Sequence, residues 1–192
     1  MKKKLIIIGA GGHAKSCIDV IENQGKFKIY GIIDKGNKKR LLNYKVLGNE
    51  KELPTIRKKI DHAFIAIGHL KDNSVRLKIQ KLLKKYSFKL PIIISKKAHV
   101  SKNSKIGEGT IVMHNCLVNS CATIGKNCII NSGAIIEHDT NIQDNVHVST
   151  NSTVNGSVLI GQNSFIGSGS VIRQNIKIKN NSFVKANTFV KK

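Results

Sequence analysis

The 192-residue sequence has no tryptophan, and aromatic residues make up only 5% of it. Hydrophobic residues make up 40%, so a core is possible, but it must be built from isoleucine, valine and small side chains. No apolar run reaches the roughly 18 residues that span a bilayer, so we expect no membrane insertion. The apolar run at residues 5–8 is also too short for a secretion signal, which predicts a cytoplasmic protein.

Acidic residues are scarce, because 33 lysines and arginines face only 11 aspartates and glutamates and the net charge is +22. The lysines are scattered rather than grouped with aromatic residues, which argues against a nucleic-acid-binding protein. A positive field of this kind favours the capture of small molecules that carry phosphate. The four cysteines form no CxxC pair, so we expect reduced thiols and no metal site.

The second half of the sequence has a regular repeat of aliphatic residues. From residue 94 onward, every sixth residue is isoleucine or valine. The series is Ile94, Val100, Ile106, Val112, Val118, Ile124, Ile130, Ile136, Ile142, Val148, Val154, Ile160, Ile166, Ile172, Ile178, Val184 and Val190. A hexapeptide period predicts a parallel β-helix in which each unit is one short strand and one turn.

Two other positions of the repeat support this prediction. Three residues after each aliphatic residue, asparagine or glycine is frequent, and these residues tolerate the positive φ of a tight corner. Four residues after it, the side chain is usually small, as in Cys116 and Cys128, and we expect it to point inward. The position just before each aliphatic residue is often apolar as well, as in Ile111, Ile129 and Val171. An outward apolar stripe indicates an interface, and three faces favour a homotrimer.

The first half has the pattern of a small α/β domain. Strands are expected at residues 5–8, 29–33 and 63–67, and helices at residues 14–23 and 72–86. A strand, a glycine-rich turn, a helix and a strand with an acidic end are typical of nucleotide-binding units. We therefore predict a small Rossmann-like domain at residues 1–93, which binds one nucleotide, and a β-helix at residues 94–192. The resemblance of its repeat to that of hexapeptide proteins implies that this β-helix is left-handed.

Hexapeptide β-helix proteins are mostly acyltransferases that use acyl-coenzyme A, and such a reaction needs a base near neutral pH. His138 is the best candidate because Glu137 and Asp139 flank it, and a neighbouring carboxylate fixes the tautomer of an imidazole. His138 also lies at a corner where any polar residue fits, so the residues alone leave its role open. His147 falls among the apolar positions and can equally be an interface residue.

The whole chain resembles the NeuD/PglD-type sugar acetyltransferases. The resemblance rests on Gly11-Gly12-His13, Asp34, Ala66-Ile67-Gly68, Ile136-Glu137-His138-Asp139 and His147. It implies a left-handed β-helix acetyltransferase that uses acetyl-CoA and no metal.

The resemblance also implies site residues. His138 would be the general base, with Asp139 raising its basicity. Asn131 and His147 would line the same site, with His147 near the acetyl group, and Gly156, Gly167 and Ser168 would approach the pantetheine arm of the coenzyme. The nucleotide would be held by Gly11, Gly12, His13, Asp34, Lys35, Gly68 and His69.

The sequence departs from this family in two places. Lys35 stands where some relatives carry a second acid, so contacts to the nucleotide base are expected to differ. The "Gly-x-Pro-Ala" segment that usually follows the last coil is missing, so the adenine end of the coenzyme is expected to bind differently.

The function expected from these features is acetylation of the amino group of a nucleotide-linked sugar, of the UDP-4-amino-4,6-dideoxy type, in bacterial surface glycan biosynthesis. Two alternatives stay open. One is O-acetylation of a sialic-acid-type sugar, and the other is a non-catalytic β-helix binding protein.

Overall fold

The computed structural model describes residues 2–191 and divides the chain into two compact units. One unit comprises Met1–Gly68 with Asp72–Pro91, and the other comprises His69–Lys71 with Ile92–Lys192. The short segment His69–Lys71 therefore belongs to the second unit although it lies within the first half of the sequence. No helix of residues 2–191 has the length and apolar character needed to cross a bilayer.

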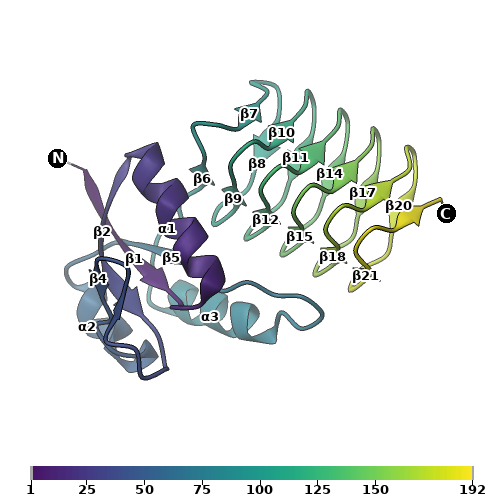
Figure 1. Cartoon of the computed structure of the whole chain (residues 1–192). Coiled ribbons are helices and arrows are strands. Elements are labelled where there is room, and N and C mark those ends of the chain that lie inside the picture. The colour runs from purple at the N-terminus through teal and green to yellow at the C-terminus, as the bar shows by residue number, and fades with distance from the viewer. Residues whose placement is uncertain (1, 192) are drawn as a thin grey trace. The chain divides into compact units, whose positions relative to one another are not determined.

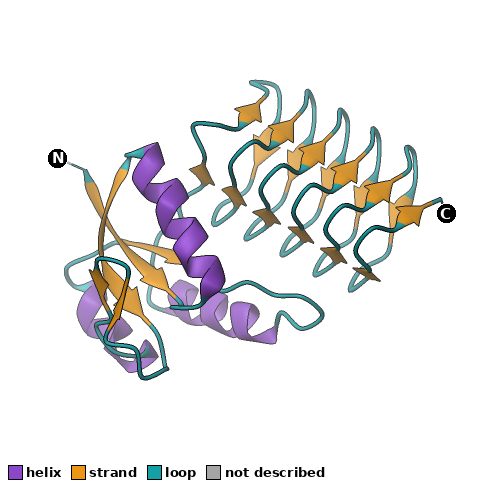
Figure 2. Cartoon of the chain, viewed as in Figure 1, coloured by secondary structure: helices purple, strands orange, loops and turns teal. Residues whose placement is uncertain are grey.

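The first unit is built on a parallel three-stranded sheet in the order β2-β1-β5 (Figure 2). Its strands are β1 (Lys3–Ile8), β2 (Phe27–Ile33) and β5 (His62–Ile65), and its main helices are α1 (Gly12–Gln24) and α3 (Ser74–Lys85). All five elements confirm the sequence prediction to within a few residues. The connection between β2 and β5 was not predicted; it contains β3 (Arg40–Leu41), β4 (Tyr44–Lys45), a 3-10 turn (Glu50–Glu52) and α2 (Leu53–Arg57).

The second unit is a parallel β-helix of stacked triangular coils (Figure 1). Its two-residue strands form three sheets of six, five and six strands. In chain order they are β6 (Ile93–Ile94), β7 (His99–Val100), β8 (Lys105–Ile106), β9 (Ile111–Val112), β10 (Leu117–Val118), β11 (Thr123–Ile124), β12 (Ile129–Ile130), β13 (Ile135–Ile136), β14 (Asn141–Ile142), β15 (His147–Val148), β16 (Thr153–Val154), β17 (Leu159–Ile160), β18 (Phe165–Ile166), β19 (Val171–Ile172), β20 (Lys177–Ile178), β21 (Phe183–Val184) and β22 (Phe189–Val190). The predicted fold class is confirmed, since each strand ends on one residue of the six-residue aliphatic series.

The corners between strands carry the backbone conformation that the sequence pattern predicts. From Gly109 to Asn187, every residue that lies three positions after an aliphatic residue of the series has a φ between 53° and 72°. Most of these residues are asparagine or glycine, and Asn103 in the first coil is an exception because its φ is not positive. Cys121, Asp139 and Ser157 adopt the same conformation without being asparagine or glycine.

The interior of the coils combines large aliphatic and small polar side chains. Cys128, Ala134 and Ser152 are fully buried, as expected for the small inward position. Ser152 donates its hydroxyl hydrogen bond to the carbonyl of Gly167 at 2.8 Å, and Thr110 donates to that of Gly125 at the same distance. A buried hydroxyl is costly unless it is hydrogen-bonded, so these side chains also tie each coil to the next.

The expectation that the apolar residues before each aliphatic residue form an exposed stripe is wrong for part of the series. Ile111 and Ile129 are fully buried within the chain, and Phe165 is 6% exposed. Val171 and Phe189 are exposed. The outward apolar stripe is therefore confined to one face, that of β7, β10, β13, β16, β19 and β22, and to the end of a second.

Thiol reactivity gives a direct check of this packing. The four cysteines are free, and only Cys121 is exposed. Burial raises the pKa of Cys17 to about 12 and that of Cys116 to about 11, which further lowers their reactivity. We expect iodoacetamide to modify one thiol per native chain and none in Cys121→Ser, as counted by intact mass. Modification of two or more thiols without denaturant would contradict the packing.

His62 makes stability sensitive to acid. Its pKa is lowered by burial, and next by the nearby Lys3, Lys89 and Arg57, which outweigh the opposite effect of Asp61. The unfolded chain therefore takes up this proton first, and the contribution of His62 is present above its ordinary pKa of about 6.5 and lost as the pH falls below it. We expect the melting temperature to drop less between pH 7.5 and 5 in His62→Gln than in the native chain. An identical drop in the two proteins would show that His62 has no such role.

Candidate active site

A cavity of about 390 Å³ opens at the carboxyl ends of the three parallel strands of the first unit. Ligands of open α/β sheets bind at this edge. The cavity is lined by six of the residues predicted to bind substrate, Gly11, Gly12, His13, Asp34, Lys35 and Gly68. The strands bring them together because β1 ends just before the glycine-rich turn, β2 ends just before Asp34, and Gly68 follows β5.

Asp34 fixes the shape of this cavity. Its carboxylate accepts hydrogen bonds from the backbone N–H groups of Ala10 and Gly36, both at 2.8 Å. Lys38 donates to the carbonyl of Ala10 at 2.9 Å. The loop after β2 is thus joined to the glycine-rich turn by two separate contacts, which hold both segments in place for a ligand.

Two further features would favour the binding of an anion in this cavity. Helix α1 begins at the cavity with Gly11 as its N-cap and without a side-chain cap, so its first N–H groups and the positive end of its dipole are available to a phosphate. Arg76 lines the same cavity, is 3% exposed and donates to the carbonyls of Ile65 and Ile67. The sequence analysis did not single out Arg76, although a charged residue on the apolar side of an amphipathic helix was a signal that could have found it.

His69 does not line this cavity. Its backbone carbonyl lies 2.8 Å from Nδ1 of His147, and the two rings are 5.3 Å apart between centroids. Because a carbonyl only accepts, Nδ1 of His147 carries the proton, and Nε2 is left to accept a hydrogen bond from the Asn131 amide at 3.2 Å. Asn131, His147 and His69 therefore form one polar cluster beside the sheet that contains β12 and β15.

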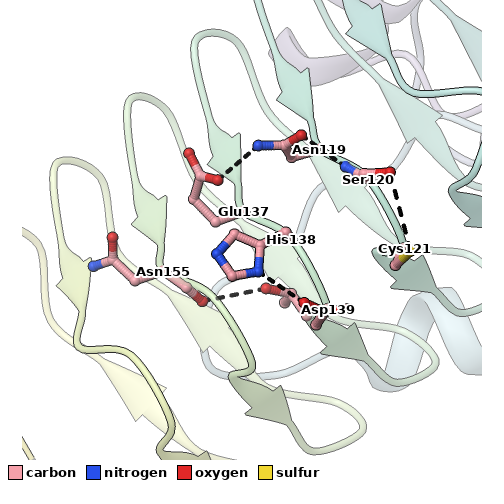
Figure 3. A network of polar contacts seen from close by, with 8 residues as sticks. Asn119, Ser120, Cys121, Glu137, His138, Asp139 and Asn155 are labelled. Atoms are coloured by element: carbon pink, nitrogen blue, oxygen red, sulfur yellow. Dashed lines mark hydrogen bonds and ion pairs between the residues drawn. The ribbon is translucent and has the colours of Figure 1, made fainter.

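His138 and Asp139 form a second cluster at the corner after β13 (Figure 3). Nδ1 of His138 lies 2.8 Å from Oδ2 of Asp139, and about half of each side chain is exposed. Since a carboxylate only accepts, this contact places the proton on Nδ1 and leaves Nε2 with a lone pair. Gly156, one coil further on, leaves room for the ring, because a Cβ at this position would lie 2.8 Å from Nε2.

The predicted site residues of the β-helix thus fall on two corners of the triangular coil. Gly156 lies at the corner of His138. Ser168 lies at the corner of Asn131, where its hydroxyl is 2.8 Å from that of Ser149. Gly167 lies beside Ser168, and a Cβ there would meet the backbone of Ala186, so coil packing alone requires this glycine. One complete strand, β13, separates the two corners.

Comparison with known proteins gives the family. The PglD N-terminal domain model matches residues 4–83, and the bacterial transferase hexapeptide model matches residues 103–138, 139–174 and 157–192. A variant of perosamine N-acetyltransferase from Caulobacter crescentus, solved with CoA and GDP-perosamine, has 30% sequence identity and a TM-score of 0.91 over 96% of this chain and 86% of that one. The acetyltransferase domain of PglB from Neisseria gonorrhoeae, solved with acetyl coenzyme A, has 26% identity and a TM-score of 0.92 over 100% of this chain and 92% of that one.

The chain belongs to the NeuD/PglD-type sugar acetyltransferase family. It is an acetyltransferase whose acyl donor is acetyl-CoA, as the sequence predicts. Among residues 2–191, no group of three or more histidine, cysteine or acidic side chains is placed to hold a metal ion.

The sequence analysis of this sugar acetyltransferase singled out Glu137 but missed its polar partner at the corner of His138. Asn119, one coil before, donates its amide hydrogen bond to Oε2 of Glu137 at 2.8 Å. The signal was present in the sequence as a spacing of 18 residues, since one coil of the β-helix contains three hexapeptides.

Gly156→Ala tests the position of the His138 ring in the acetyltransferase. The added methyl group would lie 2.7 Å from Cε1 of His138, and the exposed ring can move away without disturbing the coil. Displacement of a reacting group by about 1 Å can cost a hundredfold in rate. We expect acetyl transfer to fall at least tenfold with an unchanged melting temperature. Gln174→Ala, at the matching position of the next coil, is the control; equal activity of Gly156→Ala and this control would contradict the assignment.

Proposed function

We propose that this acetyltransferase transfers the acetyl group of acetyl-CoA to the amino group of a nucleotide-linked amino sugar, of the UDP-4-amino-4,6-dideoxy type, in bacterial surface glycan biosynthesis. The observation that carries the proposal is the His138–Asp139 pair, whose geometry leaves Nε2 of the half-exposed imidazole as a proton acceptor. Such a base is what an amine needs in order to attack a thioester.

The cavity of the first unit supports the nucleotide part of the proposal. Its open helix N-terminus offers donors to a diphosphate, and Arg76 and the exposed Lys35 add positive charge. The relative from Caulobacter crescentus was solved with GDP-perosamine, a nucleotide-linked amino sugar. Lys35 follows Asp34 where some relatives carry a second acid, so we expect the contacts to the nucleotide base to differ from those in such relatives.

In the proposed reaction, the amine nitrogen attacks the carbonyl carbon of the thioester directly. Nε2 of His138 takes a proton from the attacking nitrogen, and Asp139 stabilises the imidazolium through Nδ1. A backbone N–H group steadies the oxygen that becomes negative. The proton then passes from His138 to the departing thiolate, so no covalent acyl-enzyme is required.

The proposal includes a homotrimer. A single coil holds His138 at one corner and Asn131 with His147 at another, with the face of β13 between them. This face carries the outward apolar residues Ile135, Val171 and Phe189, of which Ile135 is half-buried in the single chain. Packing of such a face against a second copy would bring His138 of one chain toward Asn131 and His147 of its neighbour. When three chains each make the same contact with the next chain, the contacts close into a cyclic trimer.

The experiment follows coenzyme A release with acetyl-CoA and a panel of nucleotide amino sugars. We expect turnover on a UDP-linked 4-amino sugar, and a loss of kcat of about 10²–10⁴-fold in His138→Ala, the usual contribution of a general base. Asp139→Asn should lower kcat less, because Nε2 remains but its tautomer is no longer fixed. Lys105→Ala, an exposed residue of β8 outside the apolar face, is the control.

Three outcomes would contradict the proposal. Acetylation of a free sialic-acid-type hydroxyl without turnover of nucleotide sugars would favour O-acetylation. The absence of coenzyme A release with every acceptor, in a protein whose assembly is intact, would favour a non-catalytic binding protein. Full activity of His138→Ala would remove the histidine base and leave the substrate assignment standing.

A further inference from the structure

Acidic residues are rare in the β-helix, yet two of them flank His138. Between residues 94 and 192 the acids are Glu108, Glu137, Asp139 and Asp144. Asp139 is engaged by Nδ1 of the imidazole. Glu137 is not, and its carboxylate requires a separate explanation.

Asn119 determines the orientation of the Glu137 side chain. The carbonyl oxygen of the Asn119 amide accepts the backbone N–H of Ser120 at 2.7 Å, which settles which end of the amide is the nitrogen. The Nδ2 group therefore donates to Oε2 of Glu137, at 2.8 Å. Figure 3 shows this contact on the outer side of the coil, beside the ring of His138.

A neutral partner orients a carboxylate without cancelling its charge. The ion pairs of residues 2–191 do not include Glu137, and its side chain is half-buried rather than surrounded by water. A lysine or arginine in place of Asn119 would have compensated the charge. In a chain with a net charge of +22, a fixed and uncompensated carboxylate next to the base is a site for a cationic group.

We propose that Glu137, positioned by Asn119, binds the protonated amine of the acceptor sugar and so selects an amine over a hydroxyl. This inference rests on the proposed function and specifies the class of its acceptor. A sugar amine arrives largely as an ammonium group, which can donate one hydrogen bond to Glu137 and direct a second N–H toward Nε2 of His138. A hydroxyl brings no charge and leaves the carboxylate without its cation.

The proton balance is compatible with this role. The ammonium nitrogen loses two protons and forms one bond to the acetyl carbon, while the bond between that carbon and sulfur breaks. One proton leaves for solvent before attack, and the other passes through His138 to the thiolate. Glu137 ends as it began, so it acts on binding and orientation rather than as the base.

The test measures binding by calorimetry, which requires no turnover, with UDP-4-amino-4,6-dideoxyhexose and the matching UDP-6-deoxyhexose that carries a 4-hydroxyl group. Hydrogen bonds to charged groups predict that the native chain prefers the amine by about tenfold to a hundredfold. Glu137→Gln keeps the shape and a partner for Asn119 but removes the charge, so we expect its preference to fall below about threefold. Asn119→Ala, which frees the carboxylate, should give an intermediate preference.

Glu108→Gln is the matched control, because this acid pairs with Lys126 on the same β-helix and has no part in the site. It should retain the native preference. A merely structural role of Asn119 would lower the melting temperature without changing the ratio of the two affinities.

Two results would overturn the inference. Equal binding of amine and hydroxyl by the native chain would do so, even if the coenzyme A assay shows N-acetylation and the proposed function stands. Native selectivity in Glu137→Gln would do so as well. If the native chain binds neither sugar and releases no coenzyme A in the assay, both the proposed function and this inference are contradicted.

Discussion

The positive φ at the corner of each hexapeptide is the constraint on which the β-helix depends. L-residues avoid this conformation because Cβ approaches the following carbonyl, and glycine, asparagine and aspartate tolerate it best. The same constraint shapes the candidate catalytic pair. Asp139, with a φ of 58°, lies at a corner where a short acidic side chain is accepted, directly after the histidine that it contacts. The repeat thus supplies both the coil and a carboxylate 2.8 Å from an imidazole.

The triangular coil with its two-residue strands also limits which side chains of one chain can lie close together. Side chains at one corner face away from those at the next, since a full strand lies between them. His138 and the cluster of Asn131 and His147 are each well ordered by their own hydrogen bonds, at 2.8 Å to Asp139 and to the carbonyl of His69. The proposed reaction places its base in the first cluster, and the second cluster lies at a different corner of the same coil. The apolar face between the two corners would favour the proposed association of identical chains.

The sequence predicted the structure best where the pattern of residue types is periodic. The aliphatic series, the small interior residues and the asparagine corners follow from six-residue spacing, so the strands and His138 could be located in advance. The cavity residues of the first unit were found because strand ends and glycine-rich turns are local signals. Predictions that depend on tertiary packing were poorer. Ile111 is buried although its position suggested an interface, and His69 contacts His147 rather than lining the cavity.

Most corners of the β-helix have asparagine or glycine, and the corners that have another residue are also informative. Among the corner residues with positive φ in the described β-helix, three are neither asparagine nor glycine. They are Cys121, Asp139 and Ser157. They are 18 residues apart, so they stack in one column on three successive coils, with His138 beside the middle one. A left-handed cysteine or serine costs on the order of 1 kcal/mol that asparagine would largely avoid. Local rules are most often broken at functional sites, and the concentration of three exceptions here marks this corner independently of the histidine itself.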